Sequence, residues 1–581
     1  MTRQRRYLAI VTAAAGVIAV VGLVGRRATR PASTTTALRS GGEVIVSMRG
    51  EPRTFNRFAG RDQTTDLIAT LTQAKLVRIN RATQDIEPWL AERWTRSDDG
   101  RGYTLALRPN VLFSDGHPFT ADDVVFSFEA AYDDRTGSPL GDSLAVGGRP
   151  LQVTAPDPQT VAITFPSAFG PGLRLLDNLP ILAKHKLQKA LKDGTFARAW
   201  GVATPPGEIV GLGPFVLAEY HPGQRVVFTR NTHYWRVDAA GTPLPYLDRV
   251  TLEIVPDQDA ELLRLESGQI DMTADSVRPE DYAPLKRAAD AGRITLVDLG
   301  VGFDPDSLWF NLKPGAFGDD SRAAWLQRDE WRRAVSMAVD RELFAETVLL
   351  GAGVPVFGPV TPANKKWYSA AVGRESYDPA RARELLASIG LTDRNGDGVL
   401  EDAQQRPARF TLVTVKGRTA LERGAAVIRD ELKKVGVVTD VAALDQPAVV
   451  QRFLSGAYDA VYFHLITTDT DPAVNLDFWL SSGSAHVWNI GQQTPATDWE
   501  RRIDELMARQ IASPDEGERR RVFEEVQRVF AERLPVIYFV APRIIVATSS
   551  RMTNLTPAVS RPQLLWSPDT LAVRDGGRPA R

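Results

Sequence analysis

Two hydrophobic patterns follow one another along this chain of 581 residues. Short apolar runs bounded by turn residues predict strands, whereas apolar positions three and four residues apart predict amphipathic helices. The predicted strands cover residues 43–48, 103–107, 226–230, 250–255, 410–415 and 536–548. Strands that alternate with helices in this way are typical of α/β lobes.

Several predicted helices are marked by the residues that cap them. Thr120 with Asp123, and Thr419 with Glu422, have the spacing of a capping box. Asp378 before a proline starts a helix that ends at Ile389. A further helix is expected after Ser513-Pro514, and it directs these side chains toward a core: Val522, Val526, Val529 and Phe530.

Composition limits the class of protein. A chain of this length is expected to form two or three domains. Lys and Arg number 70 and Asp and Glu 71, so there is no surplus charge to attract nucleic acid or an acidic membrane. The absence of cysteine excludes disulfides, zinc thiolate sites, iron–sulfur clusters, cysteine nucleophiles and a lipid-attachment cysteine.

The N-terminus has the pattern of an export segment. Arg3, Arg5 and Arg6 precede an apolar run over residues 8–25, and a flexible linker follows up to residue 41. The apolar run is intermediate in length between a cleaved signal peptide and a membrane-spanning anchor, so both alternatives stay open. In either case the bulk of the chain is expected in the periplasm, outside the cytoplasmic membrane.

Motifs for catalysis are missing from the sequence. It contains no phosphate-binding loop, nucleophile elbow, zinc-protease or dinucleotide-binding motif, and its six histidines are scattered. We therefore expect a binding protein without a cofactor rather than an enzyme.

Residues 393–398 match the opening of a calcium-binding EF-hand loop. Asp393, Asn395 and Asp397 stand at the first, third and fifth positions, but Gln404 replaces the glutamate of position 12. Glu401 or Asp402 could substitute for it. The favoured interpretation is a turn rich in Asp, Asn and Gly between a helix and a strand.

A series of short motifs extends from about residue 42 to residue 540. The longest of them, LRPNVLFSDGHPFTADDVVFSF, begins at Leu107, and EPWLAERW begins at Glu87. The others are GEVIV with EPRTFN, GLGPF with RN and YW, YLDRV, LESGQID, RRAVSMAVDR and YDPA. Together and in this order they resemble the extracellular solute-binding proteins of family 5, the oligopeptide- and dipeptide-binding receptors of ABC importers.

The resemblance implies a two-lobed periplasmic-binding-protein fold of the α/β class. The first lobe is expected to comprise residues 42–86, 208–300 and 541–581, with a smaller domain inserted over 87–207. Residues 301–540 would form the second lobe. Two chain crossings between the lobes would act as the hinge on which they close around a solute.

The resemblance also implies a function and a site. The protein would capture a small solute, in the first place a short peptide, and deliver it as a monomer to the membrane permease of an ABC importer. Backbone contacts to the peptide are carried over to two segments, Pro52, Arg53 and Thr54 on one side and His464, Leu465 and Ile466 on the other.

The residue that would hold the peptide's α-amino group is displaced in this chain. In peptide-binding relatives an Asp stands four residues before the proline of an acidic-residue–Pro pair, but that position before Pro472 is Thr468. The candidate carboxylate, Asp469, comes one residue later. On an extended strand this shift turns a side chain to the opposite face, unless a bulge compensates.

Two alternatives remain at this stage. Asp469 and Asp471 could form an acid/base pair of a secreted hydrolase, although neighbours on one strand face cannot flank a scissile bond. The same fold could instead bind a sugar, a metal chelate or another non-peptide solute. Trp479 and Trp488 could stack on such a ligand or simply pack in a core.

Overall fold

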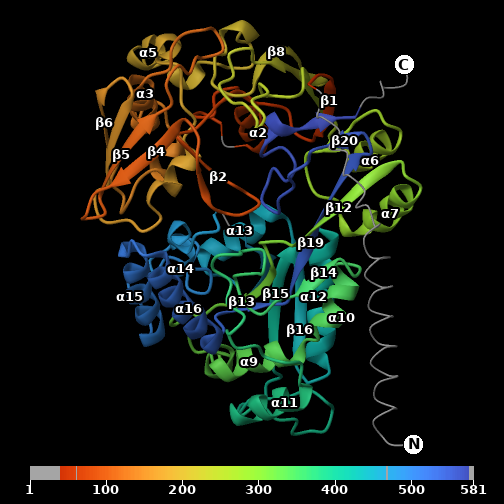
Figure 1. The fold of residues 1–581 in the computed structure, drawn as a ribbon. Coiled ribbons are helices and arrows are strands. Elements are labelled where there is room, and N and C mark those ends of the chain that lie inside the picture. Colours follow the sequence, from red (N-terminus) through yellow and green to blue (C-terminus); the bar gives the residue numbers. More distant parts are fainter. Residues whose placement is uncertain (1–39, 61, 466–468, 575–581) are drawn as a thin grey trace, which may run out of the picture. The chain divides into compact units, whose positions relative to one another are not determined.

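A computed structural model of the protein describes residues 40–60, 62–465 and 469–574 (Figure 1). Two large apolar cores organise these residues. The first core takes its side chains from residues 44–299 and 546–573, together with Ile511. The second takes them from residues 301–541. This mixed α/β architecture is that of the two-lobed fold expected from the sequence.

The largest sheet belongs to the first core. Its strands lie in the order β12 (Ile294–Val301), β19 (Val540–Ser549), β11 (Met272–Thr273), β1 (Glu43–Met48), β10 (Arg249–Ile254), β9 (Arg225–Arg230) and β8 (Phe215–His221), and β14 (Gly353–Pro355) also pairs with β19. Strand β1 pairs in parallel with both β10 and β11. The associated helices are α2 (Gln63–Thr72), α6 (Gln258–Glu266) and α7 (Tyr282–Asp290).

A four-stranded sheet lies between β3 and β8 in the sequence and packs into the same core. Its strands are β4 (Ala91–Arg96), β5 (Gly102–Leu107), β7 (Thr160–Thr164) and β6 (Gln152–Asp157), and its helices are α3 (Ala121–Tyr132), α4 (Pro139–Ser143), the 3-10 helix η1 (Gly172–Asn178) and α5 (Lys184–Lys192). This part also contains two short two-stranded sheets. One pairs β2 (Val77–Ile79) with β3 (Ile86–Pro88), and the other pairs β20 (Met552–Thr553) with β21 (Ala572–Val573).

A five-stranded sheet forms the centre of the second core. Its order is β16 (Val438–Leu444), β15 (Arg409–Val415), β17 (Ala460–His464), β13 (Asp306–Phe310) and β18 (Val536–Tyr538). Strand β15 runs parallel to β16 and β17, so their carboxyl ends reach the same edge.

The helices of this second part are α8 (Ala323–Leu326), α9 (Asp329–Ala338), α10 (Arg341–Val348), α11 (Pro379–Ser388), α12 (Thr419–Lys433), α13 (Gln446–Ser455), α14 (Leu476–Trp479), α15 (Asp498–Ala512) and α16 (Glu516–Arg533). No helix among the described residues is both long and apolar enough to span a membrane. The predicted export segment lies outside the described residues.

The chain passes between the two cores twice, at neighbouring positions. After β12 it enters the second core at β13, and it returns along β19, whose two ends pack in different cores (Figure 1). Val301 pairs with Arg543, and the Gly302 N–H donates to the Pro542 carbonyl at 2.7 Å. Two adjacent, hydrogen-bonded crossings are the connection expected for hinge motion between lobes.

The predicted strands and most of the predicted helix ends are confirmed, with small corrections. Strand 536–548 is interrupted at Phe539, which separates β18 from β19. The prediction of a capping box at Thr419 and Glu422 is wrong, because Arg418 is the N-cap and Thr419 is already helical. Glu422 instead accepts a hydrogen bond from the Gly417 N–H at 2.9 Å.

Candidate functional site

A cavity of about 860 Å³ lies between the two cores. Arg49, Gln84 and Arg174 line it from the part built on the first core, and Asp306 and His464 line it from the second. Its volume falls within the range of small-molecule sites. A solute bound here would contact both parts of the protein, which is the requirement for a receptor that closes on its ligand.

The carboxyl edge of the five-stranded sheet forms one wall of this cavity. Residues 417–421, which follow β15 and begin α12, line it together with His464, the last residue of β17. Asp306, the first residue of β13, is the register partner of His464. Ligands in α/β proteins commonly bind at such an edge, where loops and helix N-termini follow parallel strands.

Asp306 is a buried acid in this wall. Its side chain accepts a hydrogen bond from the Tyr462 hydroxyl at 2.8 Å, and no ion pair joins it to a cation among the described residues. Burial raises the pKa of Asp306 from 3.8 to about 6, although the hydrogen bond from Tyr462 opposes the shift. The cavity therefore contains a carboxyl group that changes charge close to neutral pH.

His464 lies beside two arginines. Burial lowers the pKa of His464, and the positive charges of Arg418 and Arg561 lower it further. No hydrogen bond joins its imidazole to any residue that the structure describes. The lowered pKa favours the neutral imidazole, which lines the cavity where a solute would bind.

Most of the other charges in the cavity are already paired. Six of its seven arginines lie within 4.0 Å of a carboxylate: Arg49, Arg81, Arg174, Arg278, Arg543 and Arg561. The seventh, Arg418, donates to the Gln446 side chain at 3.2 Å and has no carboxylate within ion-pair distance in the described part of the chain. Arg418 is therefore the cavity arginine available to an acidic group of a solute.

Asp469 faces the same cavity, and its carboxylate is already bound. The Arg174 guanidinium, from η1, donates through Nε to Asp469 Oδ1 at 2.7 Å. The Asp471 N–H donates to the same oxygen at 2.8 Å. Burial raises the pKa of Asp469, and Arg174 acts against this rise.

Asp471 has a different environment. It pairs with Arg519 at 2.5 Å, and both side chains are 5% exposed. It also caps the 3-10 helix η5 (Pro472–Val474) by accepting from the Ala473 N–H at 3.0 Å. Because Asp469 and Asp471 each bind their own arginine, they do not form a shared acid/base pair of the kind a hydrolase would need.

The segment Pro52–Thr54 packs against residues 200 and 201. Thr54 forms a backbone bridge with Gly201, and its hydroxyl donates to the Trp200 carbonyl at 3.3 Å. Pro52, Arg53 and Thr54 are not among the residues that line the 860 Å³ cavity. Their contact with a solute stays a prediction.

Of the second predicted ligand-binding segment, residues 464–466, the structure describes His464 and Leu465. His464 lines the large cavity, whereas Leu465 lines a smaller one of about 140 Å³ that Asp469 also lines. Ile466 and the family position Thr468 lie outside the described residues.

The two candidate tryptophans are core residues. Trp488 is 1% exposed, and its indole N–H donates to Glu500 at 3.1 Å. Trp479 is 5% exposed and packs edge-on against Phe523 and Phe530, although it also borders the 140 Å³ cavity. Trp488 therefore packs in the core, as one of the two alternatives expected. Trp479 also packs in the core, and only a small part of its surface could contact a ligand.

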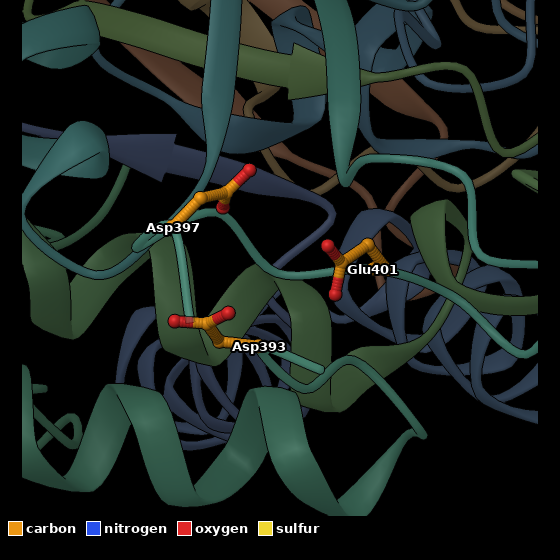
Figure 2. Close-up of side chains that lie close together, drawn as sticks. All are labelled: Asp393, Asp397 and Glu401. Atoms are coloured by element: carbon orange, nitrogen blue, oxygen red, sulfur yellow. The ribbon is translucent and has the colours of Figure 1, made fainter. Parts of the chain in front are cut away.

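The carboxylates of Asp393, Asp397 and Glu401 lie close together in the loop after α11 (Figure 2). Asp393 accepts from the N–H groups of Gly396 and Gly398, and Glu401 accepts from the Arg394 N–H at 2.8 Å. The Asn395 amide oxygen accepts from the Asp397 N–H at 2.8 Å. These bonds make the loop an Asp- and Asn-capped turn, which is the favoured interpretation, and a calcium ion on Asp393, Asn395 and Asp397 stays the untested alternative.

Three residues of the site were not predicted from the sequence: Arg174, Asp306 and Arg418. Arg174 had a signal, because it and Asp177 are the two charged residues inside the otherwise largely apolar stretch 169–182. A charge in such a stretch is normally paired when buried. Its partner is 295 positions away, so the pairing itself could not be inferred from the chain.

Comparison with known proteins places this geometry in a family. The family described as bacterial extracellular solute-binding proteins, family 5, matches residues 85–486, which is more than half of the chain. A probable ABC transporter-binding protein of Deinococcus radiodurans is 28% identical over 541 residues, or 88% of each protein. The chain belongs to the family 5 extracellular solute-binding proteins.

Solved structures share the fold. The oligopeptide-binding protein AppA of Bacillus subtilis, in complex with a nonapeptide, superposes with a TM-score of 0.67 at 24% identity and covers 93% of this chain and 100% of its own. NikA of Brucella suis, in complex with Fe(III)-EDTA, superposes with a TM-score of 0.74 at 20% identity, over 92% of this chain and 100% of its own. The fold therefore accommodates both peptides and metal chelates.

Proposed function

We propose that this protein is the exported receptor of an ABC importer, that it takes a short peptide into the 860 Å³ cavity, and that it delivers the peptide to a membrane permease. The cavity between the two cores carries this proposal. The lobes would be residues 42–86, 208–300 and 541–581 on one side and 301–540 on the other, with 87–207 inserted. The protein would act as a monomer and need no cofactor.

The distribution of charge in the cavity supports an acidic end on the solute. Arg418 lacks a carboxylate partner in the described part of the chain, and it precedes α12, whose first residues line the same cavity. A helix N-terminus favours negative charge. The carboxylate of a peptide would satisfy both groups.

A non-peptide solute is the second candidate, and one observation favours it. Asp469, the carboxylate expected to hold a peptide ammonium, is bound by Arg174. A neutral or acidic small molecule would not need that carboxylate.

Thermal denaturation with candidate solutes tests the proposal, because a ligand stabilises by RT ln(1 + [L]/Kd), about 2.7 kcal/mol at 100 Kd. We expect di- to pentapeptides to raise the Tm, and Arg418→Gln to reduce that rise. Stabilisation by sugars or chelates but by no peptide would refute the peptide proposal. Mass spectrometry of solute that co-purifies with the protein would identify the ligand directly.

A further inference from the structure

Arg174 joins the two parts of the protein across the cavity. It belongs to η1, which packs in the first core, whereas Asp469 and Thr470 follow β17 of the second core. The side chains of Arg174 and Asp469 are 7% and 15% exposed. An ion pair this enclosed is weakly screened by water and salt.

The guanidinium is held in a defined position by three groups. Besides Asp469, it donates to the Thr470 hydroxyl at 2.5 Å and to the Gln84 carbonyl at 3.2 Å. Gln84 has a φ of 68°, a left-handed conformation that is uncommon for glutamine. Its amide donates to the Ala363 carbonyl at 2.7 Å, which ties the support of Arg174 to the second core.

This arrangement changes what Asp469 offers to a solute. A carboxylate attracts a cation strongly inside a protein, but a neutralising guanidinium at 2.7 Å removes most of that attraction. A second cation at Asp469 would also be repelled by Arg174. A neutral or acidic group would meet no such penalty.

We propose that Arg174 is a specificity-determining residue that fills the cation site of Asp469, so that the receptor selects solutes with no ammonium group at this end. N-terminally blocked peptides and neutral or acidic small molecules form this class. The inference rests on the proposed function, because it assumes that solute enters the cavity between the cores.

A matched pair of peptides tests the selectivity. Calorimetry would measure trialanine and N-acetyl-trialanine with the wild type and with Arg174→Gln. We expect the wild type to bind the blocked peptide at least as tightly as the free one. Arg174→Gln frees Asp469, and we expect it to favour the free amine by about tenfold, the effect of a new charge pair of about 1.4 kcal/mol. Arg543→Gln, which removes another paired arginine of the cavity, should leave the ratio of the two affinities unchanged.

A wild type that prefers the free amine by tenfold, or an unchanged ratio in Arg174→Gln, would overturn the inference. If neither peptide binds any variant, the peptide ligand itself fails, and chemical rescue then decides the role of Arg174. Methylguanidinium at about 20 mM should raise the Tm of Arg174→Ala above its value in equimolar NaCl, by binding at Asp469. It should have no such effect on Arg174→Ala with Asp469→Asn, and an equal effect on both would overturn the inference.

Discussion

Replacement of Asp306 by asparagine should make the protein more stable at neutral pH. The native pKa of Asp306 is about 6, raised from 3.8 by burial. Between these two values the native state holds a proton that the unfolded state has lost. The contribution of Asp306 to the stability of the native state is therefore fully present below about pH 4, and it is lost as the pH rises through about 6.

The magnitude follows from the shift. A rise of about two units corresponds to about 3 kcal/mol, since each unit is worth 1.36 kcal/mol. Asp306 is 8% exposed, so little of this value is lost to solvent screening. Asparagine keeps an oxygen that accepts from the Tyr462 hydroxyl but carries no charge to desolvate. The variant should therefore match the wild type near pH 4 and exceed its free energy of unfolding by up to about 3 kcal/mol at pH 7.5.

Urea unfolding of both proteins at several pH values between 4 and 7.5 measures this difference. Asp440→Asn is the control, because Asp440 is an exposed carboxylate of the same sheet, 3.8 Å from Arg409. It should change stability by less than about 0.5 kcal/mol at every pH. A stability difference for Asp306→Asn that does not grow between pH 4 and pH 7.5 would refute the reasoning.

Three further outcomes can be checked. Arg519→Ala should destabilise the protein by about 3–5 kcal/mol in urea, because it leaves the buried Asp471 carboxylate without its cationic partner; a loss below about 1 kcal/mol would contradict this. Trp488→Phe should cost about 1–3 kcal/mol in the same assay and leave calorimetric solute affinity unchanged, whereas a loss of affinity would restore its role as a ligand residue. Calcium at about 1 mM should not change the Tm relative to EDTA, and a rise that Asp397→Asn abolishes would establish a calcium site.

Local features of this protein could be predicted from its sequence. The strand 43–48 and the helix after Asp378 were located because apolar periodicity and capping residues act over a few positions. Ordered short motifs also identified the family and hence the two-lobed fold, which the comparisons confirm. The capping box at Thr419 failed because a one-residue difference in the helix start is decided by the preceding strand and turn.

Only the tertiary structure decided which residues of the candidate site pair with one another and which are buried. Arg174 and Asp469 are 295 positions apart, and nothing local to either residue indicates that they meet. The burial of Trp488 and the placement of Thr54 against Gly201 likewise depend on how separate segments pack. Periodicity records which face of an element is apolar, but an ion pair across a cavity depends on the distance between two cores, and that distance is set by the fold.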